Sequence, residues 1–93
     1  MATPAVVIQR QTLAVGVLVP FTPPFPCHAV VVGNATADSL RVYSQNGDTT
    51  QYLEIVSGGW WSPVHPRDRV FRANEVCFYL NAIAGGPVTI EWL

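Results

Sequence analysis

The chain has 93 residues and a formal net charge of -1, with five arginines, no lysine and six acidic residues. Only 12% of its residues are charged and 49% are hydrophobic, whereas an ordinary soluble domain has about 25% charged residues. This length allows one domain with a modest core, and the balance of charge excludes the basic face that nucleic-acid binding normally needs. A surface so short of charge predicts a protein that sits against copies of itself or against a larger assembly.

No segment has the pattern of a targeting signal. Residues 1–4 carry no positive charge, and the apolar run 13–19 is shorter than the roughly 20 residues that a membrane span needs. We therefore expect a chain made in a cytoplasm without a signal peptide, and no membrane partner. The two cysteines, Cys27 and Cys77, are interpreted as reduced, partly buried thiols, with one disulfide as the alternative outside a reducing compartment.

The first third of the chain predicts three strands and a stiff connector. Residues 5–11 are β-branched without helical spacing and indicate a first strand or an extended arm, and residues 12–19 indicate a second strand. Residues 20–26 contain four prolines, which excludes a helix or a central strand; their Pro-x-x-Pro spacing also matches SH3 ligands, but a structural loop is preferred. A third strand is expected at 27–32, ended by a turn at Gly33–Asn34.

The rest of the chain predicts two hairpins separated by a long loop. Residues 39–44 and 50–56 flank Asn46–Gly47, a strong turn signal. After the loop and a short strand at 70–72, the alternating runs 76–80 and 88–92 are joined through Gly85–Gly86. Two β-type runs around a glycine pair predict a C-terminal hairpin.

Together these elements predict an all-β fold with a single domain over residues 1–93. We expect a small antiparallel β-sandwich or β-barrel, jelly-roll-like, with about seven or eight strands. Residues 1–10 form either an extended N-terminal arm or an edge strand of this domain. The order of the strands is left open.

Alternation within the strands predicts which side chains face the core. The inward positions are Leu40, Val42, Leu53, Ile55, Phe78, Leu80, Val88, Ile90 and Trp92. The outward positions are Arg41, Tyr43, Tyr52, Glu54, Cys77, Tyr79, Thr89 and Glu91. All three tyrosines of the chain are thus expected on outward positions, which is more typical of an interface than of a monomer surface.

Trp60 and Trp61 stand side by side after Gly58–Gly59. Adjacent residues of an extended segment cannot both enter one core, so at least one indole is expected to be partly exposed. One interpretation is that one indole closes the end of the sandwich and the other lies on a neighbouring loop. The alternatives are that the exposed indole anchors a protein partner or stacks on a sugar.

Three groups of residues have the atoms of a chemical site without its spacing. Ser62, His65 and Asp68 crowd into one loop without a nucleophile elbow, so a hydrolase triad is not expected. The set Cys27, His28, His65 and Cys77 lacks the short spacing of structural zinc sites. Arg67, Arg69 and Arg72 are accompanied by acidic residues, and we interpret them as ion-pairing rather than phosphate-binding groups. No cofactor, no metal and no enzymatic activity is expected.

Three stretches resemble the small all-β virion proteins of tailed bacteriophages, and in particular capsid decoration, or cement, proteins. They are residues 34–43, residues 52–56 with the glycine loop that follows, and residues 86–92; the likeness runs over most of residues 29–92. It implies a non-enzymatic protein of the virion surface, often trimeric, that binds the major capsid protein on the outside of an icosahedral shell and stabilises contacts between capsomers.

Two other functions fit the same surface. The first is a carbohydrate- or host-receptor-binding module of a phage fibre or tail tip, with Trp60, Trp61 and Tyr79 as a stacking platform. The second is a tail or connector adaptor protein. The residues predicted to contact a partner are Val6, Ile8, Tyr43, Tyr52, Trp60, Trp61, Arg67, Arg69 and Tyr79.

Overall fold

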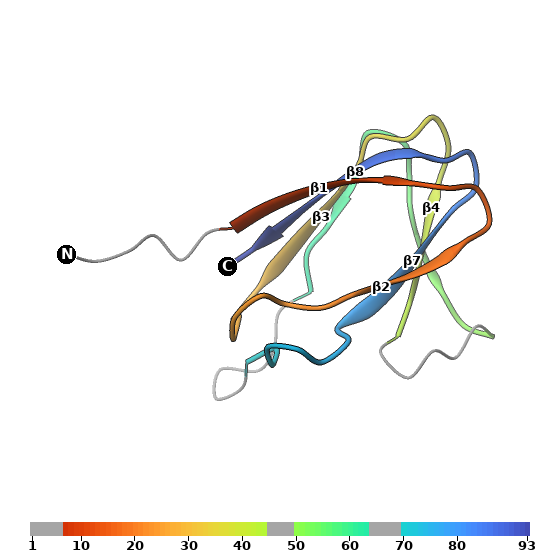
Figure 1. The fold of residues 1–93 in the computed structure, drawn as a ribbon. Coiled ribbons are helices and arrows are strands. Elements are labelled where there is room, and N and C mark those ends of the chain that lie inside the picture. Colours follow the sequence, from red (N-terminus) through yellow and green to blue (C-terminus); the bar gives the residue numbers. More distant parts are fainter. Residues whose placement is uncertain (1–6, 45–49, 64–69) are drawn as a thin grey trace.

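The computed structural model describes residues 7–44, 50–63 and 70–93, and within these ranges the chain is all-β (Figure 1). The described residues contain no helix, and hence no helix that could cross a membrane. The strands are β1 Val7–Leu13, β2 Leu18–Phe21, β3 Val30–Asn34, β4 Leu40–Tyr43, β5 Leu53–Ile55, β6 Trp60–Trp61, β7 Phe78–Ala82 and β8 Gly86–Trp92.

The strands form two antiparallel sheets of four strands each, with the orders β1-β8-β3-β6 and β2-β7-β4-β5. Strand β1 pairs with β8, β2 with β7, β3 with β6 and β4 with β5, as in one long antiparallel ribbon. The ribbon is rolled up, so that β8 also pairs with β3 and β7 with β4. This connectivity is that of a double-sheet jelly roll. The predicted β-sandwich is therefore confirmed, and the chain does not close into a single barrel.

The predicted C-terminal hairpin is wrong, although both of its strands exist. Strands β7 and β8 belong to different sheets, and the link between them crosses the end of the sandwich. Gly85 and Gly86 have the positive φ angles of 74° and 123° that the sequence suggested. A short glycine link can serve a crossing as well as a hairpin, because both need a sharp change of direction. The other predicted hairpin, formed by residues 39–44 and 50–56, is confirmed as β4–β5. Its Asn46–Gly47 turn lies outside the described residues.

Other strand boundaries differ from the prediction for reasons visible in the pairing. Strand β3 begins at Val30 and includes Gly33 and Asn34, neither of which has a positive φ. Pro20 lies inside β2, which is tolerated because β2 is at the edge of its sheet. The short strand expected at 70–72 is reduced to a bridge in which Phe71 exchanges backbone hydrogen bonds of 2.7 and 2.9 Å with Cys27.

The core lies between the two sheets and is rich in aromatic rings. The Phe78 ring lies 5.4 Å from the Phe21 ring, 6.0 Å from that of Trp92 and, edge to face, 5.7 Å from that of Trp61. The Trp92 indole N–H donates to Gln9 Oε1 at 3.1 Å, so its polar atom is satisfied. The predicted inward residues that are buried are Leu40, Val42, Ile55, Phe78, Leu80, Val88, Ile90 and Trp92.

Candidate interaction surface

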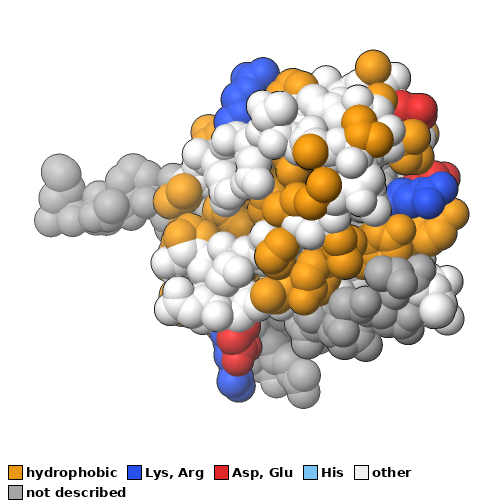
Figure 2. Space-filling model, turned by 45° about the vertical axis from the view of Figure 1, so that its right-hand side comes forward, with side chains coloured by type: hydrophobic (Ala, Val, Ile, Leu, Met, Phe, Trp, Pro, Cys, Tyr) orange, Lys and Arg blue, Asp and Glu red, His pale blue; other side chains and the backbone are white. Residues whose placement is uncertain are grey.

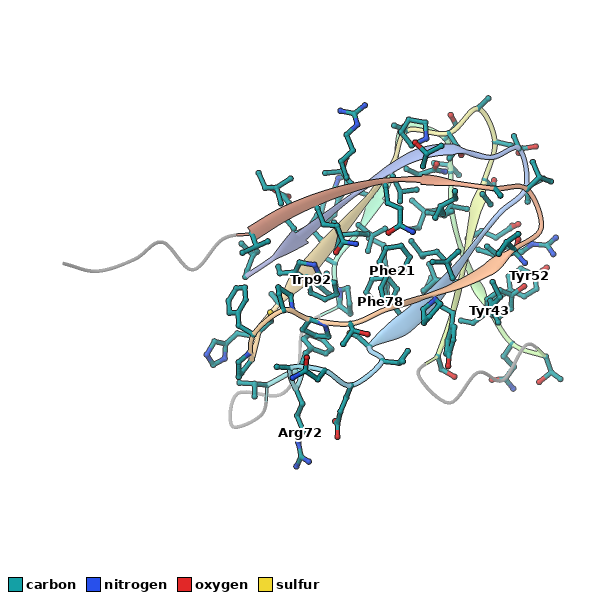
Figure 3. The ribbon with its side chains drawn as sticks, viewed as in Figure 1. Phe21, Tyr43, Tyr52, Arg72, Phe78 and Trp92 are labelled. Carbon is teal, nitrogen blue, oxygen red and sulfur yellow. The ribbon has the colours of Figure 1, made fainter. Side chains whose placement is uncertain are left out.

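The three tyrosines lie in one row across the outer face of the β2-β7-β4-β5 sheet. Tyr79 on β7 stands opposite Pro20 on one side and opposite Tyr43 of β4 on the other. The Tyr43 and Tyr52 rings are 5.8 Å apart and tilted by 55° (Figure 3). Tyr52 precedes β5, so the row continues from strand to strand over the whole width of the sheet. We call Pro20, Tyr79, Tyr43 and Tyr52 the tyrosine row, and its outward direction confirms the prediction from alternation.

The members of the row differ in exposure. Tyr43 is only 6% exposed, although it points away from the core, whereas Tyr52 is 48% exposed.

The guanidinium of Arg41 lies 4.6 Å above the Tyr52 ring, a cation–π contact. Arg41 Nε is also 3.7 Å from Glu54 Oε2. The interaction of the Arg41 guanidinium with the Tyr43 side chain is the main cause that raises the pKa of Arg41 above its ordinary value. The described part of the outer face thus presents packed aromatic rings beside the Arg41–Glu54 ion pair.

Few charges interrupt this face. The next register row along the sheet consists of Leu18, Asn81, Arg41 and Glu54. Figure 2 shows hydrophobic side chains gathered at the centre of the view and toward its right, where basic and acidic side chains lie close together. This face carries tyrosine and arginine, which are enriched in protein interfaces, beside a leucine, a proline, an asparagine and a glutamate.

The two adjacent tryptophans separate as the alternation required. Trp61 pairs with Val32 and turns inward onto Phe78, whereas Trp60 pairs with Gly33, points outward and is 72% exposed. Trp60 lies on the outer face of the β1-β8-β3-β6 sheet, opposite to the face that carries Tyr79. Trp60, Trp61 and Tyr79 therefore do not form the single stacking platform that the sequence suggested.

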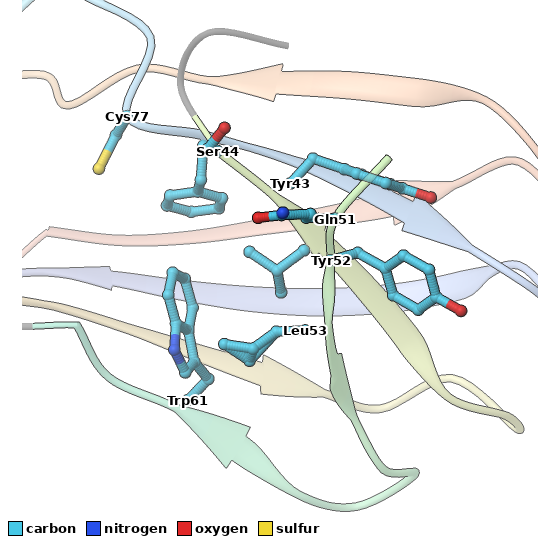
Figure 4. A pocket seen from close by; sticks show the side chains of 9 residues that line it. Tyr43, Ser44, Gln51, Tyr52, Leu53, Trp61 and Cys77 are labelled. Carbon is cyan, nitrogen blue, oxygen red and sulfur yellow. The ribbon is translucent and has the colours of Figure 1, made fainter. Parts of the chain in front are cut away.

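A hollow opens between the two sheets at the edge formed by β5 and β6 (Figure 4). Its volume is about 360 Å³, and Trp61, Leu53 and Cys77 line its wall. Leu53 is on the predicted inner face but is 43% exposed, because the three-residue strand β5 leaves this end of the core uncovered. The hollow places Trp61 within reach of solvent on one side while its other side packs in the core.

The two cysteines are free thiols, which confirms the first of the two interpretations. Cys27 is buried and donates to the Phe25 carbonyl oxygen at 3.0 Å. Burial is the main cause that raises the pKa of Cys77 to about 12, so this thiol is protonated and a poor nucleophile at neutral pH. Within the described residues no group of three or more His, Cys, Asp and Glu side chains could hold a metal ion.

The remaining predicted contact residues divide into two groups. Ile8 lies on the outer face of β1 and is 65% exposed. Val6, Arg67 and Arg69 lie outside the described residues, and so do His65 and Asp68 of the triad and zinc sets.

Pro20 and Leu18 were not predicted as surface groups, because residues 20–26 were assigned to a connector and residues 12–19 to a strand whose outward positions were not assigned. The edge position of β2 brings both into the face of the tyrosine row. The local signal for this was weak, because the four residues of β2 are all apolar and show no alternation.

Comparison with known proteins adds no relative. No protein-family model, no curated protein and no solved structure matches the chain.

Proposed function

We propose that the protein is a non-enzymatic structural protein that docks on a larger assembly through the tyrosine row. The sequence resemblance suggests what the assembly is: the outer surface of an icosahedral phage capsid, where the protein would act as a decoration protein between capsomers. Its partners would then be the major capsid protein and copies of itself, a trimer in the resembling family.

The observation that carries this proposal is the composition of the outer face of the β2-β7-β4-β5 sheet. Pro20, Tyr79 and Tyr43 stand in register across it, and the half-exposed Tyr52 packs on Tyr43; among the described residues of this face only Arg41 and Glu54 are charged. Tyrosine combines a large apolar ring with a wet hydroxyl, which suits a surface that is hydrated before docking and covered afterwards. Many weak contacts of this kind, repeated around a shell, add up through multivalency.

The proposal is tested by binding to shells of the phage that encodes the protein. We expect the wild-type protein to co-sediment with shells to saturation and to raise their melting temperature. Tyr52→Thr combined with Tyr79→Thr removes two rings while introducing threonine, which also has a high strand propensity, and should weaken binding at least tenfold. Trp60→Thr, an equally drastic loss on the opposite face, is the matched control and should bind as the wild type. Absence of binding by a folded wild-type protein would refute the proposal.

A second function, carbohydrate binding, is favoured by one observation. Trp60 is 72% exposed and stands beside Gly33, whose missing side chain leaves the neighbouring surface flat. An exposed indole above a flat floor suits stacking on a sugar ring, and jelly rolls also serve as lectin domains. Glycan-array binding that is lost in Trp60→Thr but kept in the tyrosine double variant would select this function over shell decoration.

A further inference from the structure

The four sheet edges of the sandwich are not equally protected. Strand β2 carries Pro20, while β5 and β6 have only three and two residues. Proline and short length are two of the means by which proteins prevent an exposed edge from pairing with another chain. Three of the four edges are therefore blunted.

The fourth edge, β1, lacks these protections. It has seven residues, contains no proline and no lysine, and carries one charge, Arg10. In the described chain β1 pairs only with β8, through an unbroken register from Val7–Trp92 to Leu13–Gly86. The other side of β1 therefore offers a row of backbone donors and acceptors to another strand.

The sequence of β1 shows which strand fits. Val-Ile-Gln-Arg-Gln-Thr-Leu presents the same kind of side chain read from either end: apolar, β-branched, amide, arginine, amide, β-branched, apolar. In an antiparallel pair centred on Arg10, Val7 stands opposite Leu13, Ile8 opposite Thr12 and Gln9 opposite Gln11 of the other strand. Uncharged side chains of matching kind thus face one another on both sides of Arg10, and cross-strand side-chain pairs are what stabilises a sheet.

We propose that β1 pairs with β1 of a second copy of this chain, antiparallel and centred on Arg10, so that two four-stranded sheets become one continuous sheet. This contact goes beyond the proposed function, because it uses an edge and not the tyrosine row. It closes around a twofold axis and gives a dimer, in contrast to the trimer of the resembling family.

Arg10 is the unfavourable position of this pairing. The two arginines of a dimer face each other, and like charges directly opposite are destabilising. Glu91 lies diagonal to Arg10, because Ile8 pairs with Glu91 and Arg10 with Thr89; this diagonal is within reach of long side chains. A single strand pair with such a centre predicts a weak dimer, which forms at high concentration.

The test is sedimentation of the wild type and three double variants at concentrations up to about 1 mM, a range suited to a weak contact. The wild type should dimerise. Ile8→Lys with Thr12→Lys should weaken dimerisation about tenfold, because introduced lysines of opposite copies then face each other twice. Ile8→Lys with Thr12→Glu should restore it, because each lysine then faces a glutamate. Val15→Lys with Val17→Lys adds the same charge at sites that are 63% and 48% exposed outside β1, and should leave the dimer intact.

Each result decides the proposal. A wild type that is monomeric at the highest concentration overturns it, and so does an oligomer that both lysine pairs leave unchanged. Failure of the lysine–glutamate pair to restore the dimer overturns it as well, provided that circular dichroism shows a folded variant; an unfolded one is replaced by Ile8→Glu with Thr12→Lys, which tests the same opposition. Shell binding by the tyrosine variants is measured separately, so failure here leaves the proposed function standing.

Discussion

Asn34 is a polar residue at the centre of a fully bonded network. It is 3% exposed, and its Nδ2 donates to the carbonyl oxygens of Ile55 at 2.8 Å and Asp38 at 2.9 Å. Its Oδ1 accepts from the Thr36 amide at 2.9 Å and from the Thr36 hydroxyl at 2.6 Å. The side chain thereby ties the end of β3 to β5. The sequence predicted a turn at Gly33–Asn34, because this pair favours turning. Nothing local in the sequence reveals that β5 brings a carbonyl group to Asn34.

We expect Asn34→Ala to lower the free energy of unfolding by about 3 kcal/mol, because it leaves several buried groups without partners. Asn34→Asp should be comparably harmful, since carboxylate oxygens would face the two carbonyl oxygens. Urea denaturation measures both, with Asn81→Ala on the outer face of β7 as the control. A loss at Asn34 no larger than at Asn81 would contradict this account.

The two tryptophans give a matched pair for the core. Trp61 packs edge to face on Phe78, while Trp60 is 72% exposed. We predict that Trp61→Ala destabilises the fold by about 2–3 kcal/mol and that Trp60→Ala changes it by less than about 0.5 kcal/mol. Thermal unfolding measures the difference. Equal effects would contradict the assignment of Trp61 to the core and Trp60 to the surface.

The buried thiol of Cys77 predicts a pH dependence. Its pKa is raised to about 12 in the folded chain from an ordinary value of 9.0. Above pH 9 the unfolded state therefore loses its proton first, and the stability that the protonated thiol contributes is lost as pH rises from 9 to 12. Denaturation midpoints should fall over this range, and less steeply in Cys77→Ala. An unchanged slope in the variant would show that other groups cause the fall.

At the scale of elements, the crossing from β7 to β8 depends on glycine. A side chain on Gly85 would meet the Leu13 carbonyl oxygen at 3.1 Å and Val15 Cγ2 at 3.2 Å, and its φ of 74° is unfavourable for other residues. Gly85→Ala should cost about 1–3 kcal/mol. Gly33→Ala is the control, because the nearest atom to its added carbon is at 3.8 Å and its φ is ordinary. Similar unfolding free energies for the two variants would contradict the strain at Gly85.

The strands were more predictable than their partners. Alternation placed Leu40, Val42 and Ile90 correctly in the core, because burial on one face leaves a period of two in the sequence. The same pattern could not show that β7 and β8 belong to different sheets, since a crossing glycine link and a hairpin look alike locally. For the same reason it grouped Tyr79 with Thr89, which lie on the outer faces of opposite sheets.

The candidate surface could be predicted only in part. Outward tyrosines follow from alternation, but their alignment into one row depends on the register between β2, β7 and β4. The burial of Tyr43 depends further on its packing against Tyr52, which sequence spacing does not specify.

At the level of the whole molecule, the described surface carries few charges and exposes apolar side chains on several sides. Ile8, Val15, Val56 and Trp60 are each more than 60% exposed and lie on different parts of the sandwich. Such a surface fits a molecule that is covered on several sides in its working state. The tyrosine row and the β1 edge are separate parts of that surface, so one could bind the shell while the other binds a second copy.

Hydroxyl-radical footprinting of the protein, free and bound to shells, tests whether the tyrosine row is the docking surface. We expect Tyr52 and Tyr79 to be oxidised more slowly in the bound state, whereas oxidation of Trp60 on the opposite face is unchanged. Protection of Trp60 with unaltered oxidation of both tyrosines would contradict it.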